Sequence, residues 1–77
     1  MTTDAIELRL VDQARNRLRV YRLCDAVDLF GERCLLIQWG RLGQRLRTRL
    51  EPFKDDAARE LRRAELVALR KRHGYTS

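Results

Sequence analysis

The sequence predicts an α+β fold, an antiparallel sheet of about four strands with one C-terminal helix packed on it. Through the first half of the chain, apolar residues recur at every second position, which is typical of half-buried strands. After Asp55 they recur at helical spacing instead. Strands and helix are therefore separated along the chain, as in α+β domains. The 77 residues allow one domain, which we expect to span residues 1–77.

The first two strands are predicted on either side of a polar turn. Ile6, Leu8 and Leu10 share one face of a first strand, because side chains at alternate positions point the same way. Residues 12–16, Asp-Gln-Ala-Arg-Asn, are polar and favour a turn. Alternation resumes from Arg17 to Leu23, which predicts a second strand.

The third and fourth strands are predicted as a hairpin. A loop over residues 28–32 precedes a third strand from Arg33 to Arg41. Leu42-Gly43 then forms a tight connection. A fourth strand follows from Arg45 to Leu50, and Pro52 ends it because proline cannot donate a ladder hydrogen bond.

The C-terminal third predicts a helix with an alanine-rich face. Asp55 or Asp56 can cap its N-terminus, and Gly74 follows its last turn as a C-terminal cap. We expect the helix to lie close to the sheet through a stripe of small residues, formed by Ala57, Leu61, Ala64 and Ala68. On this assignment the side chains off the stripe are Arg59, Arg62, Arg63, Leu66 and Arg70, with Leu66 facing away from the sheet. The chain ends, Thr2-Thr3 and Thr76-Ser77, are expected to be frayed.

Charge is distributed unevenly along the chain. The formal net charge is +6, and fifteen of the seventeen basic residues are arginine. Residues 45–77 carry ten basic and five acidic side chains, whereas residues 1–44 carry seven and six. Arginine makes forked hydrogen bonds and stacks on flat groups, so this bias indicates an anionic partner such as nucleic acid. The competing interpretation is that a high-GC genome enriches arginine whatever the function.

Other classes of function find little support in the sequence. Cys24 and Cys34 lack metal-binding spacing and histidine neighbours, so we expect reduced cysteines, no metal and no cofactor. His73 has no partner at catalytic spacing, so we expect no enzymatic activity. Asp4 and Glu7 do not suit an export signal, and no apolar run approaches the ~20 residues that cross a bilayer. We therefore expect a cytoplasmic monomer without a membrane partner.

The candidate binding residues surround the single tryptophan. Trp39 offers a flat face, Gly40 permits close backbone approach and Arg41 supplies a positive charge, which together suit a sugar or base and its phosphate. On the fourth strand, same-face side chains ~6.6 Å apart would match the spacing of phosphates, and this row comprises Arg45, Arg47 and Arg49. The competing interpretations are that Trp39 is a lid on the core and that the arginines form a solvated face.

The chain resembles the WGR domain, which occurs in poly(ADP-ribose) polymerases, bacterial regulators and stand-alone bacterial proteins. The matching stretches are Asn16–Tyr21, the signature Ile37–Gly43, Pro52-Phe53, Ala57 and the ending Lys71–Tyr75. They follow the order found in the family. The resemblance implies an antiparallel sheet with one helix against it, in agreement with the fold predicted above.

The resemblance also implies nucleic-acid binding at ends, nicks or single strands, with DNA more expected than RNA. Because Asn and Gln are few and no recognition helix is evident, we expect recognition of structure and not of sequence. The resemblance implies that Trp39 stacks on a terminal nucleotide sugar, that Arg41 contacts phosphate and that Gly40 allows close approach. Residues expected to be structural are Tyr21, Phe53, Gly74 and Tyr75. No counterpart of the polymerase catalytic domain is recognised, so no polymer synthesis is expected. The alternative is a protein-interaction module that docks on an acidic partner, using Leu66 and the helix surface.

Overall fold

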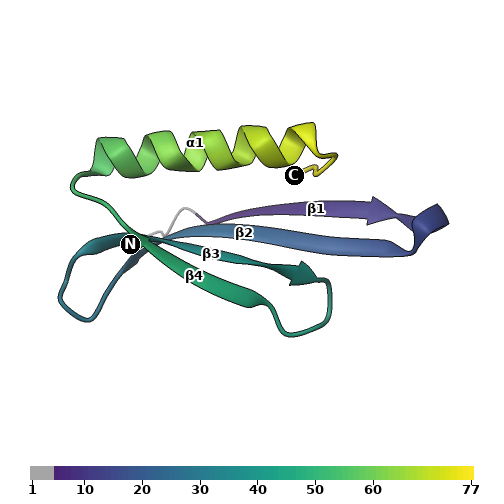
Figure 1. Cartoon of the computed structure of the whole chain (residues 1–77), viewed down its shortest axis with the longest axis horizontal. Coiled ribbons are helices and arrows are strands. Elements are labelled where there is room, and N and C mark those ends of the chain that lie inside the picture. Colours follow the sequence, from purple (N-terminus) through teal and green to yellow (C-terminus); the bar gives the residue numbers. More distant parts are fainter. Residues whose placement is uncertain (1–4) are drawn as a thin grey trace.

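Four antiparallel strands form one sheet in the order β1-β2-β3-β4, and one helix lies across one of its faces (Figure 1). The structure is a computed structural model that describes residues 5–77. Its elements are β1 (Ile6–Asp12), the short helix η1 (Gln13–Arg15), β2 (Arg17–Val27), β3 (Arg33–Arg41), β4 (Arg47–Pro52) and α1 (Asp56–Arg72). The predicted α+β class is thereby confirmed. Thr2 and Thr3, which we expected to be frayed, lie outside the described residues.

Two predicted strand boundaries are wrong. β2 continues past Leu23 to Val27, because the additional residues pair with the first part of β3. Asp25 lies within this extension, opposite Leu35, and a carboxylate on the core-facing side interrupts the apolar alternation that predicted the strand. β4 begins at Arg47, so Arg45 lies in the turn that precedes it.

The core lies between α1 and the facing side of the sheet. Its strand residues are Leu8, Tyr21, Leu23, Leu35 and Ile37, and Leu66 and Tyr75 cover them from the C-terminal third. Leu23 and Leu35 are fully buried at the centre of the sheet. Burying each leucine of this kind contributes about 1.5–3 kcal/mol. The core therefore depends on contacts between the middle strands and the helix.

The side of α1 that faces the sheet is not the one predicted. Leu66 is 6% exposed and belongs to the core, whereas Leu61 is 62% exposed. Ala57, Ala64 and Ala68 are exposed as well. The predicted alanine stripe is therefore wrong, as is the prediction that Leu66 faces away. The helix meets the sheet instead through Arg59, Arg62, Arg63, Leu66, Val67 and Arg70.

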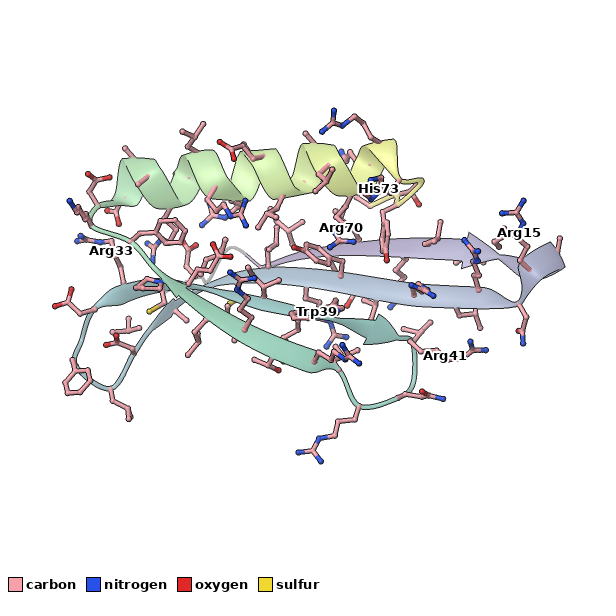
Figure 2. All side chains as sticks on the ribbon, in the orientation of Figure 1. Arg15, Arg33, Trp39, Arg41, Arg70 and His73 are labelled. Carbon is pink, nitrogen blue, oxygen red and sulfur yellow. The ribbon has the colours of Figure 1, made fainter. Side chains whose placement is uncertain are left out.

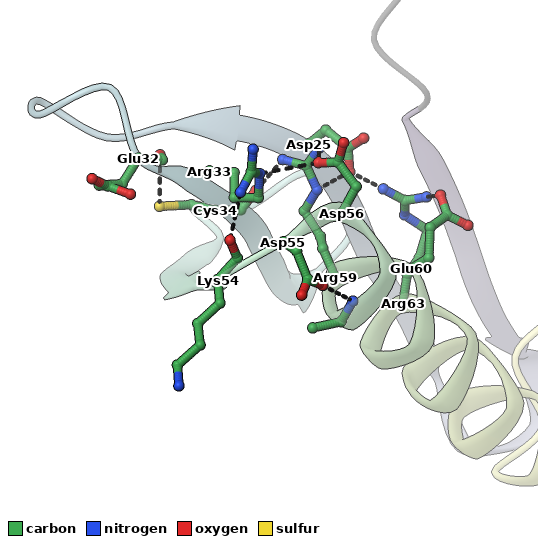
Figure 3. Close-up of polar contacts among 11 residues, drawn as sticks. Asp25, Glu32, Arg33, Cys34, Lys54, Asp55, Asp56, Arg59, Glu60 and Arg63 are labelled. Carbon is green, nitrogen blue, oxygen red and sulfur yellow. Dashed lines mark hydrogen bonds and ion pairs between the residues drawn. The ribbon is translucent and has the colours of Figure 1, made fainter.

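Carboxylates on the sheet explain this orientation of the helix. Asp25 of β2 accepts a hydrogen bond from Arg63 and lies 3.5 Å from Nε of Arg59 (Figure 3). Glu51 of β4 accepts two hydrogen bonds from Arg62, at 3.0 and 3.2 Å. Long arginine stems cover apolar surface while their heads pair with carboxylates. Small side chains on the same face could not reach these partners.

The segment between β4 and α1 fixes where the helix begins. The backbone N–H of Phe53 donates to the carbonyl of Arg33, and the phenyl ring packs against the core. Arg33 in turn donates from Nη1 to the carbonyl of Lys54 at 2.6 Å (Figure 3). Asp55 then caps the helix by accepting from the N–H of Ala58 at 2.8 Å, so Asp55 and not Asp56 is the cap.

The C-terminus of α1 ends in a Schellman motif. His73 occupies the cap position that we expected for Gly74, and Gly74 follows it with φ of +98°. The N–H of Gly74 donates to the carbonyl of Lys71, and the N–H of Tyr75 donates to that of Arg70. This arrangement turns the chain back sharply and places the Tyr75 ring over the sheet.

The last residues pair with the outer edge of β1. Thr76 and Arg9 exchange two backbone hydrogen bonds of 2.8 Å, which form an antiparallel bridge. The expectation that Thr76 is frayed is therefore wrong. Tyr75, immediately before the bridge, is 8% exposed and packs its ring edge-on to Tyr21 at 6.3 Å between centroids. The bridge and the tyrosine pair together hold the end of the chain on the sheet.

Candidate nucleic-acid interface

Strand register places Trp39 at the centre of a basic surface. On β3, Trp39 lies opposite Tyr21 of β2 on one side and Arg47 of β4 on the other. Two residues further on, Arg41 lies opposite Arg19. Residues that are directly opposite share a face of the sheet, so these five side chains lie on the same face as the core. The end of the sheet that carries the β1–β2 turn extends beyond the C-terminal end of α1 (Figure 1).

A groove of about 440 Å³ lies at this end of the molecule, and we call it the basic groove. Figure 2 shows Trp39, Arg41 and Arg70 on the sheet and helix that border it. Its lining residues are Arg19, Trp39, Gly40, Arg41, Gln44, Arg45, Arg47, Arg70 and Tyr75. Among residues 5–77, no carboxylate lines the groove, whereas five of its lining side chains are arginines, so the charge of this lining is positive.

Ion pairing separates the groove arginines from the others. Eight arginines have a carboxylate within 4.0 Å: Arg9, Arg15, Arg22, Arg33, Arg49, Arg59, Arg62 and Arg63. Seven have no such partner among residues 5–77, and five of these line the basic groove. Unpaired like charges that gather at one site repel each other, which an anionic ligand would relieve.

The structure brings together five of the six predicted binding residues. Those in the basic groove are Trp39, Gly40, Arg41, Arg45 and Arg47. Arg49 is different, because it lies 3.3 Å from Glu51 and lines an adjoining space instead. The predicted row of three evenly spaced arginines on one strand is not formed, since Arg45 lies in the turn before β4.

Sequence reasoning missed Arg19, Gln44, Arg70 and Tyr75 as residues of the groove. Arg19 could have been found from strand register, because it lies two residues before Tyr21, which pairs with Trp39. Arg70 was missed because the wrong face of the helix was assigned to the sheet. Once Leu66 is placed in the core, Arg70 one turn later lies on the same side.

Trp39 is half-buried and serves the core and the groove together. It packs against the core cluster, and it also lines the basic groove. A second space of about 270 Å³ lies on its other side, between α1 and β3, and we call it the inner hollow. Its lining includes Ile37, Leu66 and Leu69, so it is partly apolar. Trp39 and Arg70 are among the residues that border both spaces.

Gly40 has a backbone conformation that other residues rarely adopt. Its φ is +154°, and a Cβ built there would lie 3.2 Å from Cδ2 of Leu46. Leu46 belongs to the turn between β3 and β4, so that turn packs directly over the glycine. Gly40 therefore lets the turn fold back beside Trp39 and Arg41.

Glu51 is a carboxylate at the rim of the inner hollow. The hydrogen bond from Arg62 lowers its pKa below the ordinary value, more strongly than burial raises it. The same contact raises the pKa of Arg62. Glu51 thus pairs with Arg49 and Arg62 beside the inner hollow, whereas the arginines of the basic groove have no carboxylate partner in the described residues.

The cysteines and histidine contribute nothing to the groove. Cys24 is half-buried, Cys34 is buried, and both are free thiols. His73 is exposed at the end of α1 (Figure 2). Within residues 5–77, no three His, Cys, Asp or Glu side chains gather in a way that could hold a metal ion.

The fold and the groove define a small α+β module with a basic, aromatic surface at one end of its sheet. A sequence model of the WGR domain family matches residues 5–77, and the chain belongs to this family. The WGR domain is generally a nucleic-acid-binding module. The predicted family is thereby confirmed.

A bacterial protein is similar to most of this chain. Over 67 residues the chain is 33% identical to the uncharacterized protein y4dW of Sinorhizobium fredii. The match covers 84% of this chain and 32% of that protein, so the chain spans about a third of the relative's length. No solved structure matches the chain. In the part of the chain that the structure describes, no helix has the length and apolar character needed to span a membrane.

Proposed function

We propose that this chain binds nucleic acid through the basic groove, DNA in preference to RNA, at ends, nicks or single strands. One observation carries the proposal: five arginines without carboxylate partners in the described chain gather beside the single tryptophan. Phosphates supply the missing negative charge, and the indole supplies a surface for a sugar or base. The preference for DNA ends rests on what the family resemblance implies for Trp39 and Arg41.

Each groove residue has a distinct proposed role. The indole of Trp39 stacks on an exposed sugar or base, and Arg41 beside it binds a phosphate of the same strand. Arg19, Arg45 and Arg47 neutralise neighbouring phosphates. Gln44 is the only amide among the lining side chains, so the groove offers little means to distinguish bases. Recognition is thus expected to follow the structure of the nucleic acid and not its sequence. The proposed role is binding alone, without a catalytic step.

A fluorescence titration of Trp39 tests the proposal, because it is the only indole in the chain. The ligands are a blunt duplex, a nicked duplex, a closed circular duplex and a single strand, in DNA and RNA forms, at two salt concentrations. We expect quenching that is strongest with DNA ends, nicks or single strands. Binding should weaken steeply with salt, because phosphate neutralisation releases counterions.

Arg41→Ala and Arg17→Ala form a matched pair in the same titration. Both remove one exposed arginine that has no carboxylate partner in the described residues, but Arg17, at the start of β2, lies outside the groove. We expect Arg41→Ala to weaken binding by about tenfold or more, and Arg17→Ala by much less. Binding that is indifferent to salt, or absent with every ligand, would refute the proposed function.

A protein-interaction role is the second candidate function, and it rests on other residues than those the sequence suggested. Leu66, which we expected to be an exposed contact residue, is buried. The observation that now favours this role is the β2–β3 turn, where Leu29 is 99% and Phe30 86% exposed. Exposed apolar pairs of this kind are characteristic of protein contacts. Partner capture that survives Trp39→Ala but is lost in Leu29→Ser with Phe30→Ser would favour it.

A further inference from the structure

Arg70 is stacked on aromatic rings at the boundary between α1 and the sheet. Its guanidinium carbon lies 4.2 Å from the ring centroid of Tyr21 and 5.8 Å from that of Tyr75. The two rings are themselves packed at 68°, so they form two sides of a fixed aromatic corner. A guanidinium at these distances is attracted by the electron-rich faces of the rings.

The guanidinium of Arg70 has no polar partner in the described chain. Within residues 5–77 its side chain makes no hydrogen bond or ion pair, and its Nε is buried without an acceptor. Nε of Arg63 is buried without an acceptor as well, but the terminal nitrogens of Arg63 contact Asp25 and Glu60. Arg59 contacts Asp25 and Arg62 contacts Glu51, so Arg70 differs from these three arginines in lacking a carboxylate partner in the described chain. A partly buried charge without hydrogen bonds is costly, so such a group needs an explanation.

The position of Arg70 supplies that explanation. Its side chain borders the basic groove and also the inner hollow, as does Trp39. Its backbone carbonyl accepts the N–H of Tyr75 in the Schellman motif, which fixes the last helical turn over the sheet. The guanidinium is therefore preorganised by stacking and by the helix cap, at the inner end of a groove that lacks carboxylates.

We propose that Arg70 is a phosphate-binding residue of the basic groove, held in place by Tyr21 and Tyr75. Nε of Arg70 is buried, so the edge formed by its two terminal nitrogens is the one that can meet two phosphate oxygens. The ligand chemistry is a phosphate oxyanion of a nucleic-acid strand, either an internal phosphodiester or a terminal phosphate. This inference rests on the proposed function, because it assigns a further residue to the same site.

Substitution at Arg70 and at Arg72 tests the inference. Arg72 is exposed on the same helical turn, has no carboxylate partner in the described residues and does not line the basic groove. Arg70→Gln and Arg72→Gln therefore change the net charge equally. We expect Arg70→Gln to weaken single-strand DNA binding by about tenfold or more and to lower the salt slope by about one. Arg72→Gln should change affinity by less than about twofold.

Arg70→Lys separates geometry from charge. It keeps the positive charge but loses the planar fork, so we expect an unchanged salt slope and an affinity reduced by several-fold. Thermal unfolding of each variant shows whether the fold survives. An NMR titration of the wild-type chain provides a result that needs no variant. In it, the Nε–H signal of Arg70 should shift on addition of a single-stranded DNA oligonucleotide.

The outcomes distinguish this inference from the proposed function. Absence of binding by the wild-type chain would refute both. Wild-type binding with equal effects of Arg70→Gln and Arg72→Gln, or with an unmoved Arg70 signal, would refute the role of Arg70 alone. Two strands of one sequence, with and without a terminal phosphate, identify the bound group. A loss of affinity for both strands in Arg70→Gln assigns an internal phosphodiester, and a loss confined to the phosphorylated strand assigns the terminal phosphate.

Discussion

The guanidinium of Arg63 is bonded to the carboxylate of Asp25, a residue 38 positions earlier in the chain. Arg63 is 7% exposed, so this contact connects the middle of α1 to the C-terminal part of β2 inside the protein. Arg59 shares the same carboxylate, and both arginines also reach acidic residues on the helix itself (Figure 3). Asp25 is thus the sheet residue that balances two helix charges.

Asp25→Asn should destabilise the fold strongly. It leaves Arg63 buried without a charged partner on the sheet, and a buried charge that loses its partner typically costs about 3 kcal/mol. Glu60→Gln is the control, because Glu60 contacts Arg63 as well but is 69% exposed. We expect this control to change the free energy of unfolding by less than about 0.5 kcal/mol. Urea unfolding measures the free energy of unfolding of each variant. Equal losses in the two variants would show that Asp25 is not the main partner of Arg63.

Leu66→Ala and Leu61→Ala test which face of the helix meets the sheet. Leu66 is 6% exposed within the core, so its truncation should lower the free energy of unfolding by about 2–4 kcal/mol. Leu61 is 62% exposed, and its truncation should cost less than about 0.5 kcal/mol. The alanine-stripe orientation requires the opposite order. Thermal or urea unfolding of the two variants therefore decides between the orientations.

The sequence predicted the strands better than it predicted the packing of the helix. Alternation identifies a strand from its own residues, as in the run that contains Leu8. A helix presents several faces, and the face that packs on the sheet depends on which sheet residues lie opposite it. Here Asp25 and Glu51 on the sheet select the arginine-rich side, and neither contact can be read from the periodicity of the helix itself. Apolar periodicity alone therefore favoured the wrong stripe.

Some residues of the basic groove could be predicted from the sequence, whereas others could not. Trp39, Gly40 and Arg41 are consecutive, so their proximity could be predicted from the sequence. Arg19 and Arg70 reach the same groove through strand register and helix orientation, which depend on contacts between distant residues. The sequence motif therefore predicted the residues at the centre of the groove. The residues that line its sides could be identified only from the tertiary structure.

Gly40→Ala should strain the turn between β3 and β4. The positive φ of Gly40 and the 3.2 Å approach to Leu46 both oppose a side chain there, so we expect a loss of about 1–3 kcal/mol in stability. In a Leu46→Ala background the steric part disappears, and the same substitution should cost less. A double-mutant cycle by thermal unfolding measures this coupling, and additive effects would show that the contact with Leu46 is unimportant.

Glu51 should make stability depend on acid pH. Its pKa in the folded chain is lowered from the ordinary 4.5, chiefly by the hydrogen bond from Arg62. A lowered folded pKa stabilises the fold above the unfolded value, and this contribution is lost as pH falls below about 4.5 through the folded pKa. Glu51→Gln lacks the titrating group. The stability difference between the wild-type chain and this variant should therefore shrink on acidification, and a constant difference would contradict the assignment.

The strand order leaves β4 as the outermost strand on one side of the sheet. The opposite edge, on β1, is partly occupied because Thr76 pairs with Arg9. An open edge invites strand pairing between molecules, and charged side chains or proline on that edge oppose it. Arg47, Arg49 and Pro52 lie on β4, so this edge carries residues of the kinds that oppose pairing with another molecule, and one of them, Arg47, also lines the basic groove. Apolar replacement of these arginines would therefore be expected to reduce solubility, whereas lysine would preserve it.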